Sequence, residues 1–298
     1  MPQLMWTRFL SRILGLLVFI LGVFALPSVP EGHAAEIGFI DAIQQRGYLR
    51  VGLPPYDTPP AYYIDPESQQ LVGFDVDLAR GLAKALDVEL RFDRESSSFN
   101  ELVARVGRDE FDMAIGKLGQ TYSRLANAFP IQYLHLRHAL LADRQFIASL
   151  GVDPDDPDFG NALMKSSMRI GSIENSTWEV GVDMYFPNAN FVAFSDWSSS
   201  QSALLISEPA ISQNSSIDAI YRDATEIKKI VYDNPALTLD YVPVILDDIF
   251  EECSIYFSES GYRAFSAFVP FYLDNSWGSI KDDQELIQEY NAYYYPAS

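Results

Sequence analysis

Cysteine is nearly absent from this 298-residue sequence, which contains only Cys253. A single cysteine cannot form an internal disulfide, so the count gives no indication of an oxidising or a reducing compartment. Cys253 lies in the apolar run 253–257, and this position predicts a small core residue.

Basic residues are also few. The chain has 21 Lys plus Arg against 41 Asp plus Glu, a formal net charge of −20, and such a chain repels a phosphate backbone. We therefore expect no nucleic-acid partner. Hydrophobic residues make up 48% and charged residues 21%, proportions typical of a folded protein, and the length favours two domains over one.

The common signatures of catalysis and metal binding are missing. There is no Gly-x-Ser-x-Gly elbow, no Walker loop and no His-Glu-x-x-His motif. His135 and His138 are three residues apart in a predicted strand, where this spacing points them to opposite faces, so we expect no metal. We also expect no cofactor and no catalytic residue; Lys117 is the one candidate general acid or base, if it is buried.

Only one long apolar run is present, at the N-terminus. Arg8 and Arg12 precede an uninterrupted apolar stretch over 13–26, and no acidic residue lies among them. These 14 residues are fewer than the ~20 that a transmembrane helix needs. A basic region followed by a short apolar region is typical of a secretory signal peptide.

Small residues follow this run and offer a cleavage site. We expect cleavage after Ala34 or Ala35, so that residues 1–35 form the signal peptide and the remaining chain is exported to the periplasm. The alternative is an uncleaved anchor, since the apolar segment lengthens if it is counted from Phe9. No later apolar run approaches 18 residues.

The remaining chain alternates short β-rich runs with helical patterns, which predicts an α/β fold with largely parallel sheets. The first series has a strand, a Pro-rich aromatic loop, a βαβ unit, and a further helix and strand, at 48–51, 54–63, 71–92, 99–106 and 111–115. The second series has three strands, at 168–173, 191–194 and 217–221, and helices from 177 and around 200–206. Each series predicts one lobe.

The tail, 261–295, has two amphipathic helical patterns separated at 275–278. It ends in an aromatic cluster, Tyr290, Tyr293, Tyr294 and Tyr295. Aromatic residues at helical spacing usually face a core, so we interpret the cluster as packing and not as a binding site.

Five segments, in this order and at this spacing, carry a resemblance to a known family: 49–52 (LRVG), 72–79 (VGFDVDLA), 111–115 (FDMAI), 121–124 (TYSR) and 217–223 (IDAIYRD). Over roughly 47–294 the chain resembles the type II periplasmic amino-acid-binding proteins, the family 3 extracellular solute-binding proteins of ABC importers. The resemblance implies a monomer that captures an amino acid or related small polar acid and delivers it to the importer's membrane subunits.

The resemblance also implies the architecture. Two α/β lobes are joined by two crossing strands, near 133–140 and 247–253, and the ligand cleft lies between the lobes. The division becomes 1–35 for the signal peptide, 36–138 plus 249–298 for lobe 1, and 139–248 for lobe 2.

A buried zwitterionic ligand needs a partner for each of its charges. By resemblance, Arg124 binds the carboxylate, because its planar fork donates two parallel hydrogen bonds, and Asp223 on the opposite lobe binds the ammonium group. Thr177 begins a helix whose N–H groups can meet the same carboxylate. The structural alternatives are a solvated helix arginine, a surface carboxylate and an ordinary helix cap.

Two aromatic residues, Tyr56 and Phe99, lie where the family stacks rings on the ligand, with core packing as the alternative. The chain departs from the family at Lys117 and Gly119, which replace small hydroxyl or glycine residues facing the ligand. Lys117 can pair with an acidic group of the ligand or extend out of the cleft into solvent.

Two further departures follow from the same comparison. Prolines at 54 and 55 stand where many relatives have an acidic residue for the ammonium group, and Ala61 replaces a phenylalanine. Together with Lys117, these departures argue against a standard α-amino acid as the ligand, but they do not argue against the fold.

Two other functions are compatible with this scaffold. One is an enzyme similar to the cyclohexadienyl dehydratases, which catalyse elimination in the same cleft. The other is an accessory protein that presents its ligand to a membrane sensor. No output domain is attached to the chain, and only the partner distinguishes sensing from transport.

Overall fold

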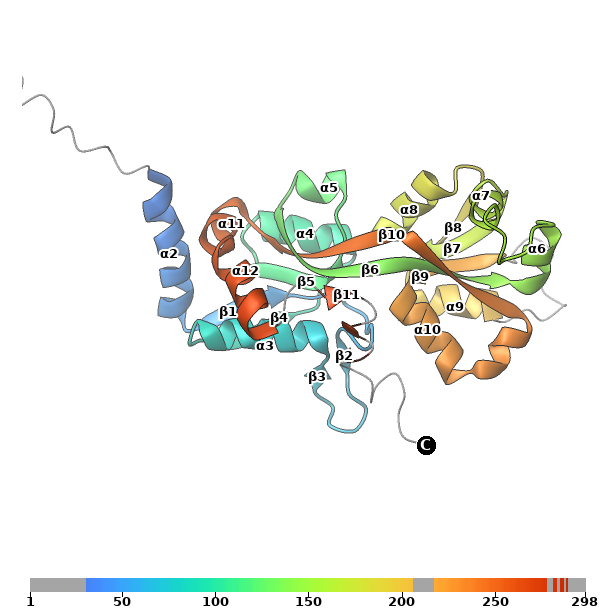
Figure 1. The fold of residues 1–298 in the computed structure, drawn as a ribbon. Coiled ribbons are helices and arrows are strands. Elements are labelled where there is room, and N and C mark those ends of the chain that lie inside the picture. The colour runs from blue at the N-terminus through green and yellow to red at the C-terminus, as the bar shows by residue number, and fades with distance from the viewer. Residues whose placement is uncertain (1–30, 206–216, 278–280, 283–284, 287, 289–298) are drawn as a thin grey trace, which may run out of the picture.

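Two long antiparallel strands, β6 (Phe129–Asp143) and β10 (Tyr241–Phe257), run through both halves of an elongated molecule (Figure 1). The structure, a computed structural model, describes residues 31–205, 217–277, 281–282, 285–286 and 288. Residues 1–30 of the predicted signal peptide and the Tyr290–Tyr295 cluster lie outside these residues, and residues 31–35 begin the helix Glu31–Arg46.

A single mixed sheet connects the two lobes, with the strand order β4-β1-β5-β10-β6-β9-β7-β8. In lobe 1, β1 (Tyr48–Gly52) pairs in parallel with β4 (Glu89–Asp93) and β5 (Met113–Leu118). In lobe 2, β7 (Arg169–Ile173) pairs in parallel with β8 (Asn190–Phe194) and β9 (Ala219–Asp223). The antiparallel β6 and β10 lie between these two sets, and β11 (Lys281–Asp282) pairs with β6.

Helices cover both faces of the sheet (Figure 1). Those of lobe 1 are α2 (Glu31–Arg46), α3 (Phe74–Ala85), α4 (Phe99–Gly107), α5 (Tyr122–Leu125), α11 (Glu259–Phe265) and α12 (Phe268–Tyr272), followed by the π-helical turn η2 (Leu273–Trp277). Those of lobe 2 are α6 (Arg144–Ser149), α7 (Phe159–Met164), α8 (Thr177–Tyr185), α9 (Trp197–Leu205), α10 (Ala224–Asp233) and the 3₁₀ helix η1 (Pro235–Leu239). Within the described part of the chain, no helix combines the length and the apolar character needed to cross a membrane.

The strands bury side chains on both faces because helices lie on both sides. On β5, Met113 and Ile115 belong to the core under α3, while Ala114 and Leu118 belong to the core under α4. Such strands read as continuous apolar runs, which is why 111–115 was recognisable in the sequence. Cys253 is fully buried in the first of these cores, as predicted.

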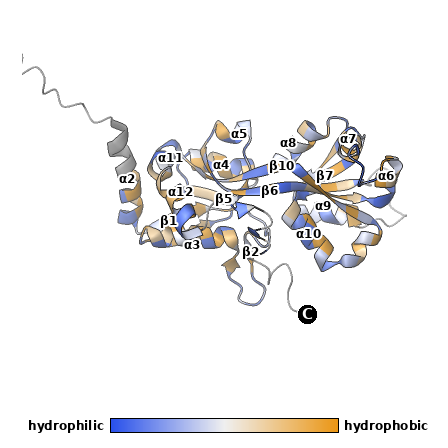
Figure 2. Ribbon diagram, viewed as in Figure 1, coloured by the Kyte–Doolittle hydropathy of each residue, from blue (hydrophilic) through white to orange (hydrophobic). Residues whose placement is uncertain are grey.

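The two crossing strands change character at the waist between the lobes. There β10 carries three more residues than β6, because Leu246 pairs with His138 and the next pair is Phe250 with Arg137. This irregularity lies at 247–249, inside the crossing that the resemblance implied. Figure 2 shows that both strands are hydrophilic at this point.

One detail of the predicted βαβ unit was wrong. The first strand of the parallel βαβ unit is β1, and helix α3 connects it to its parallel neighbour β4. The run near residue 71 forms only the short strand β3 (Leu71–Val72), paired with β2 (Tyr63–Ile64) in a separate hairpin. The β-rich composition indicated a strand, but it could not indicate which sheet the strand joins.

Gly73, between β3 and α3, is required by its backbone. Its φ of +122° is unfavourable for other residues, and a Cβ there would lie 2.4 Å from the carbonyl oxygen of Ala61. We expect Gly73→Ala to lower the free energy of unfolding by about 2 kcal/mol or more, because strain and overlap each cost about 1–3 kcal/mol.

Gly160→Ala is the matched control for this substitution. Gly160 lies in α7, and a Cβ there meets no atom within 4 Å. Alanine should leave stability unchanged or raise it by up to about 1 kcal/mol. Urea denaturation measures both variants, and equal effects would contradict the assignment of strain to Gly73.

Candidate functional site

The seven predicted ligand residues lie on both sides of the junction between the lobes. Lobe 1 contributes the loop after β1, the start of α4, the end of β5 and the short helix α5, with Tyr56, Phe99, Lys117, Gly119 and Arg124. Lobe 2 contributes the start of α8, with Thr177, and the end of β9, with Asp223. The carboxyl ends of sheet strands are where open α/β folds place ligand groups.

Arg124 is an almost fully buried cation, with 2% of its surface exposed. Its Nε donates to Asn100 Oδ1 at 2.9 Å, its Nη1 donates to the carbonyl of Gly119 at 2.8 Å, and its guanidinium lies over the ring of Phe99. Its Nη2 is buried and has no hydrogen-bond partner among the described residues. Burial lowers the pKa of Arg124 from its ordinary value. This guanidinium therefore keeps one donor for an anionic group.

Lys117 crosses from lobe 1 to lobe 2. Its Nζ donates to Asp223 Oδ2 at 2.5 Å and to Glu226 Oε1 at 2.6 Å, and all three side chains are buried. Burial alone would lower the pKa of Lys117, but the carboxylates of Asp223 and Glu226 outweigh burial and raise it. The ammonium group thus stays charged, and the two lobes are joined by an internal ion pair.

The backbone at Lys117 is held in an uncommon conformation, with a φ of +52°. Its N–H donates to Asp75 Oδ2 and to the Tyr133 hydroxyl, each at 3.1 Å, and that hydroxyl in turn donates to Asp75 Oδ1 at 2.5 Å. Burial raises the pKa of Asp75 to about 7. Helix α3 and strand β6 therefore direct the Lys117 side chain toward lobe 2.

Asp223 is the N-cap of α10. Its Oδ1 accepts from the Thr225 N–H at 3.1 Å, from the Glu226 N–H at 3.2 Å, and from the Thr225 hydroxyl. Burial acts to raise the pKa of Asp223, but Lys117 and Arg222 prevail and lower it to about 2. Asp223 is therefore an anion that accepts four hydrogen bonds from protein groups.

Arg222 and Glu226 complete this cluster and were missed in the sequence. Arg222 donates to Glu226 through Nε at 2.9 Å and Nη2 at 3.1 Å, and its guanidinium lies over the rings of Trp178 and Trp197. Its Nη1 is buried without a hydrogen-bond partner in the described part of the chain. The spacing of four residues, on either side of Asp223, was the available signal.

A third acidic side chain, Glu251 of β10, is buried and interacts electrostatically with Arg124. A Cβ on Gly119 would overlap Glu251 Oε1 at 1.4 Å and Thr177 Cγ2 at 2.6 Å, so only glycine leaves room for both side chains. Burial raises the pKa of Glu251 to about 7, although the Thr177 hydroxyl and the Arg124 cation act in the opposite direction.

His138 lies beside Glu251, with its Nε2 3.7 Å from Glu251 Oε2, and its Nδ1 contacts the Tyr221 hydroxyl. Burial lowers the pKa of His138 to about 4, so the ring is neutral near pH 7. His135, by contrast, packs on the ring of Phe250. No group of side chains able to hold a metal ion occurs among the residues that the structure describes.

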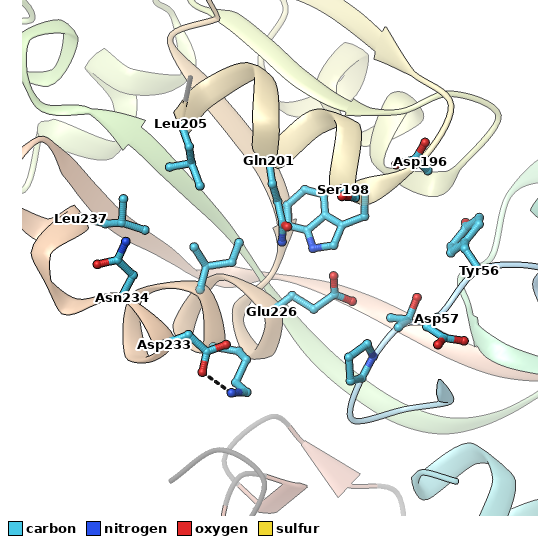
Figure 3. A pocket seen from close by; sticks show the side chains of 15 residues that line it. Tyr56, Asp57, Asp196, Ser198, Gln201, Leu205, Glu226, Asp233, Asn234 and Leu237 are labelled. Atoms are coloured by element: carbon cyan, nitrogen blue, oxygen red, sulfur yellow. Dashed lines mark hydrogen bonds and ion pairs between the residues drawn. The ribbon is translucent and has the colours of Figure 1, made fainter. Parts of the chain in front are cut away.

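Two cavities lie at the junction of the lobes. The larger, of about 520 Å³, lies between the loop of Tyr56 and Asp57 in lobe 1 and helices α9 and α10 in lobe 2 (Figure 3). Gln201 and Glu226 point into it from lobe 2 (Figure 3). The smaller, of about 180 Å³, lies between Thr121 and helix α8, next to Glu251.

The sequence matches the model of the bacterial extracellular solute-binding proteins, family 3, over residues 49–293. This chain belongs to that family. No curated protein matches the sequence of this solute-binding protein.

Solved structures share the fold at low sequence identity. AbpA of Streptococcus pneumoniae, an amino acid ABC transporter substrate-binding protein bound to L-arginine, has a TM-score of 0.63 at 20% identity, over 86% of this chain and 100% of its own. A mutant of ArgBP from T. maritima gives 0.62 at 23% identity, over 85% and 99%. The ancestral amino acid-binding protein AncCDT-1, a precursor of cyclohexadienyl dehydratase, gives 0.61 at 19% identity, over 84% and 98%. These likenesses confirm the type II periplasmic-binding fold that the sequence predicted.

Within the solute-binding protein, the predicted site residues form two connected groups. Arg124, Gly119 and Phe99 lie together in lobe 1, and Tyr56 packs edge-to-face on Phe99 at 5.5 Å. Lys117 and Asp223 meet between the lobes. Their roles in binding stay predictions. Asp223 is no surface carboxylate and Arg124 no solvated arginine, since both are buried.

Proposed function

We propose that this solute-binding protein captures an amino acid or related small polar acid between its lobes and delivers it to an ABC importer. The observation that carries the proposal is the buried guanidinium of Arg124 at the lobe junction, with one donor unpaired. An unpaired buried donor is costly, and a ligand carboxylate would satisfy it with a charge-assisted hydrogen bond.

Relatives support the class of ligand. AbpA is described bound to L-arginine, and a putative binding component of an ABC transporter from Wolinella succinogenes is described in complex with lysine. The family is extracellular, so we propose export to the periplasm through the N-terminal segment, with action as a monomer.

The proposed mechanism is closure around the ligand. The division into lobe 1 (36–138 plus 249–298) and lobe 2 (139–248) places a hinge near 247–249, where the pairing of β6 and β10 is irregular. A ligand that contacts both lobes in the closed form, and only one lobe in the open form, favours closure. The importer then recognises the closed form.

Arg124→Ala tests this proposal. A thermal-shift screen against L-arginine, L-lysine, dicarboxylates, polyamines and prephenate-like acids first finds a ligand, because a compound that binds only the folded state raises Tm. Calorimetry with that compound should then give a Kd raised at least about tenfold, a loss of about 1.4 kcal/mol.

Arg108→Ala is the control, since Arg108 forms an exposed ion pair with Glu110. It should bind the same compound as the unmodified protein does. A Kd unchanged by Arg124→Ala, in a variant that still unfolds cooperatively, would remove Arg124 from the site.

A second candidate function is catalysis of elimination in the same cleft. The observation that favours it is Glu251, a buried carboxyl whose pKa burial raises to about 7 and which can therefore donate a proton near neutral pH. Lys117 is a poor candidate acid or base, because Asp223 and Glu226 raise its pKa. Consumption of a bound compound would favour the enzyme, and an unconsumed compound favours the binding protein.

A further inference from the structure

Asp223 is the carboxylate that the resemblance assigns to the ligand's ammonium group. In the structure its partner is the ammonium group of Lys117, which lies between the lobes. We propose that the cleft selects carboxylates that lack an α-ammonium group. The inference rests on the proposed function and names the class of ligand within it.

The first argument is that Asp223 has no acceptor to spare. Its Oδ1 accepts from two backbone N–H groups and the Thr225 hydroxyl, and its Oδ2 accepts from Lys117. A carboxylate offers about four lone-pair sites, and Asp223 accepts four hydrogen bonds, while its Oδ2 also lies 4.0 Å from Arg222 Nε. A ligand ammonium could bind here only by displacing Lys117.

The second argument concerns Glu226, the other carboxylate of the cluster. Its Oε1 accepts from Lys117 and from Arg222 Nη2, and its Oε2 accepts from Arg222 Nε. Displacing Lys117 from both carboxylates would leave a buried cation unpaired, which is strongly unfavourable. A ligand without an ammonium group avoids this cost.

The acidic residues that line the larger cavity are also engaged. Asp57 accepts from Arg94 Nη2 at 2.9 Å, Asp196 accepts from the Ser199 N–H at 2.8 Å, and Asp233 pairs with Lys229. Glu251 lies at the smaller cavity instead.

Two of the groups that remain unpaired near the junction can only donate. Arg124 Nη2 and Arg222 Nη1 are buried without hydrogen-bond partners in the described part of the chain, and both side chains are 2% exposed. The Tyr56 hydroxyl, at the larger cavity, is likewise unpaired. The charges of Lys117 and Arg222 are balanced by the carboxylates of Asp223 and Glu226. The unpaired guanidinium donor of Arg124 therefore favours an anion over a second ammonium group.

Matched pairs of compounds test the selection without any substitution. Each pair consists of an α-amino acid and the same molecule with hydrogen in place of the amino group: L-glutamate and glutarate, L-leucine and 4-methylpentanoate, L-phenylalanine and 3-phenylpropionate, L-arginine and 5-guanidinopentanoate. We expect the purified protein to bind the ammonium-free member of at least one pair at least tenfold more tightly, by calorimetry. Equal or tighter binding of the amino acid in the pairs that bind would overturn the inference and leave the proposed function standing.

Lys117→Ser gives the converse test, because it removes the lysine partner of Asp223 and Glu226 and leaves these carboxylates able to bind a ligand's ammonium group. We expect its ratio of Kd values within a pair to move at least tenfold toward the amino acid. The amino acid should also raise the Tm of this variant, since its ammonium replaces the missing cation. Lys84→Ser, on the exposed face of α3, is the control and should keep the original ratio.

The outcomes separate the two proposals. An unchanged ratio in a folded Lys117→Ser would overturn the inference alone. If Lys117→Ser does not fold, the pairs measured on the unmodified protein still decide. Binding of no member of any pair, by either protein, would overturn the proposed function and the inference with it.

Discussion

Replacing Asp223 by alanine is expected to lower the free energy of unfolding by about 3–5 kcal/mol, the usual cost of removing one partner of a buried ion pair. Lys117 would retain Glu226, but Arg222 and Lys117 would then share one carboxylate in a buried site. The N-cap of α10 is lost as well, which costs about 1 kcal/mol. Urea denaturation near pH 7 measures the change.

Two further variants separate the charge from the cap. Asp223→Asn keeps a good N-cap residue but loses the charge. Its free energy of unfolding should therefore exceed that of Asp223→Ala by no more than about 1 kcal/mol. Asp77→Ala removes an acidic residue from the first turn of α3, where Asp77 pairs with the exposed Arg80, and should cost less than about 1 kcal/mol. A loss for Asp223→Ala as small as that for Asp77→Ala would contradict the buried ion pair.

Glu251→Gln should change how stability depends on pH. Burial raises the pKa of Glu251 from 4.5 to about 7 in the folded protein, so between these values the folded state holds a proton that the unfolded chain has released. Stability therefore falls as pH rises through this window, and the penalty is complete above about pH 7. Relative to the unmodified protein, the variant should gain about 3 kcal/mol from about pH 4.5 to about pH 8, since one pKa unit corresponds to about 1.4 kcal/mol.

The comparison isolates Glu251 from its charged neighbours. Arg124, Arg222, Asp223 and His138 surround it and are present in both proteins, so their own titrations largely cancel in the difference. Glu252→Gln, at the exposed neighbouring position, is the control and should give a curve parallel to that of the unmodified protein. A difference between Glu251→Gln and the unmodified protein that stays constant with pH would contradict the raised pKa.

Much of the fold could be predicted because the signals are local. The apolar periodicity of α3 and α4 and the buried run of β5 each identify an element from adjacent residues. The hairpin of β2 and β3 was misjudged for the opposite reason. A short β-rich run carries no information about its partner strand, and β3 joins β2 while β1 joins the main sheet.

The candidate site was predictable only residue by residue, and only through the resemblance. Arg124 and Asp223 were named from motifs, and both are buried at the junction of the lobes. Their partners were not foreseen. Arg222 and Glu226 were not singled out, because a sequence does not show that two tryptophans and a lysine from distant parts of the chain contact them.

The sequence by itself determined the two α/β series, because periodicity is a property of neighbouring residues. The crossing strands and the buried arginine were implied by the resemblance, which rests on the order and spacing of motifs. Only the tertiary structure decided that Lys117 pairs with a carboxylate 106 residues away. The reason is physical: burial makes an unpaired charge so costly that each of these ions must find a counterion. Which counterion lies within reach depends on how the two lobes meet.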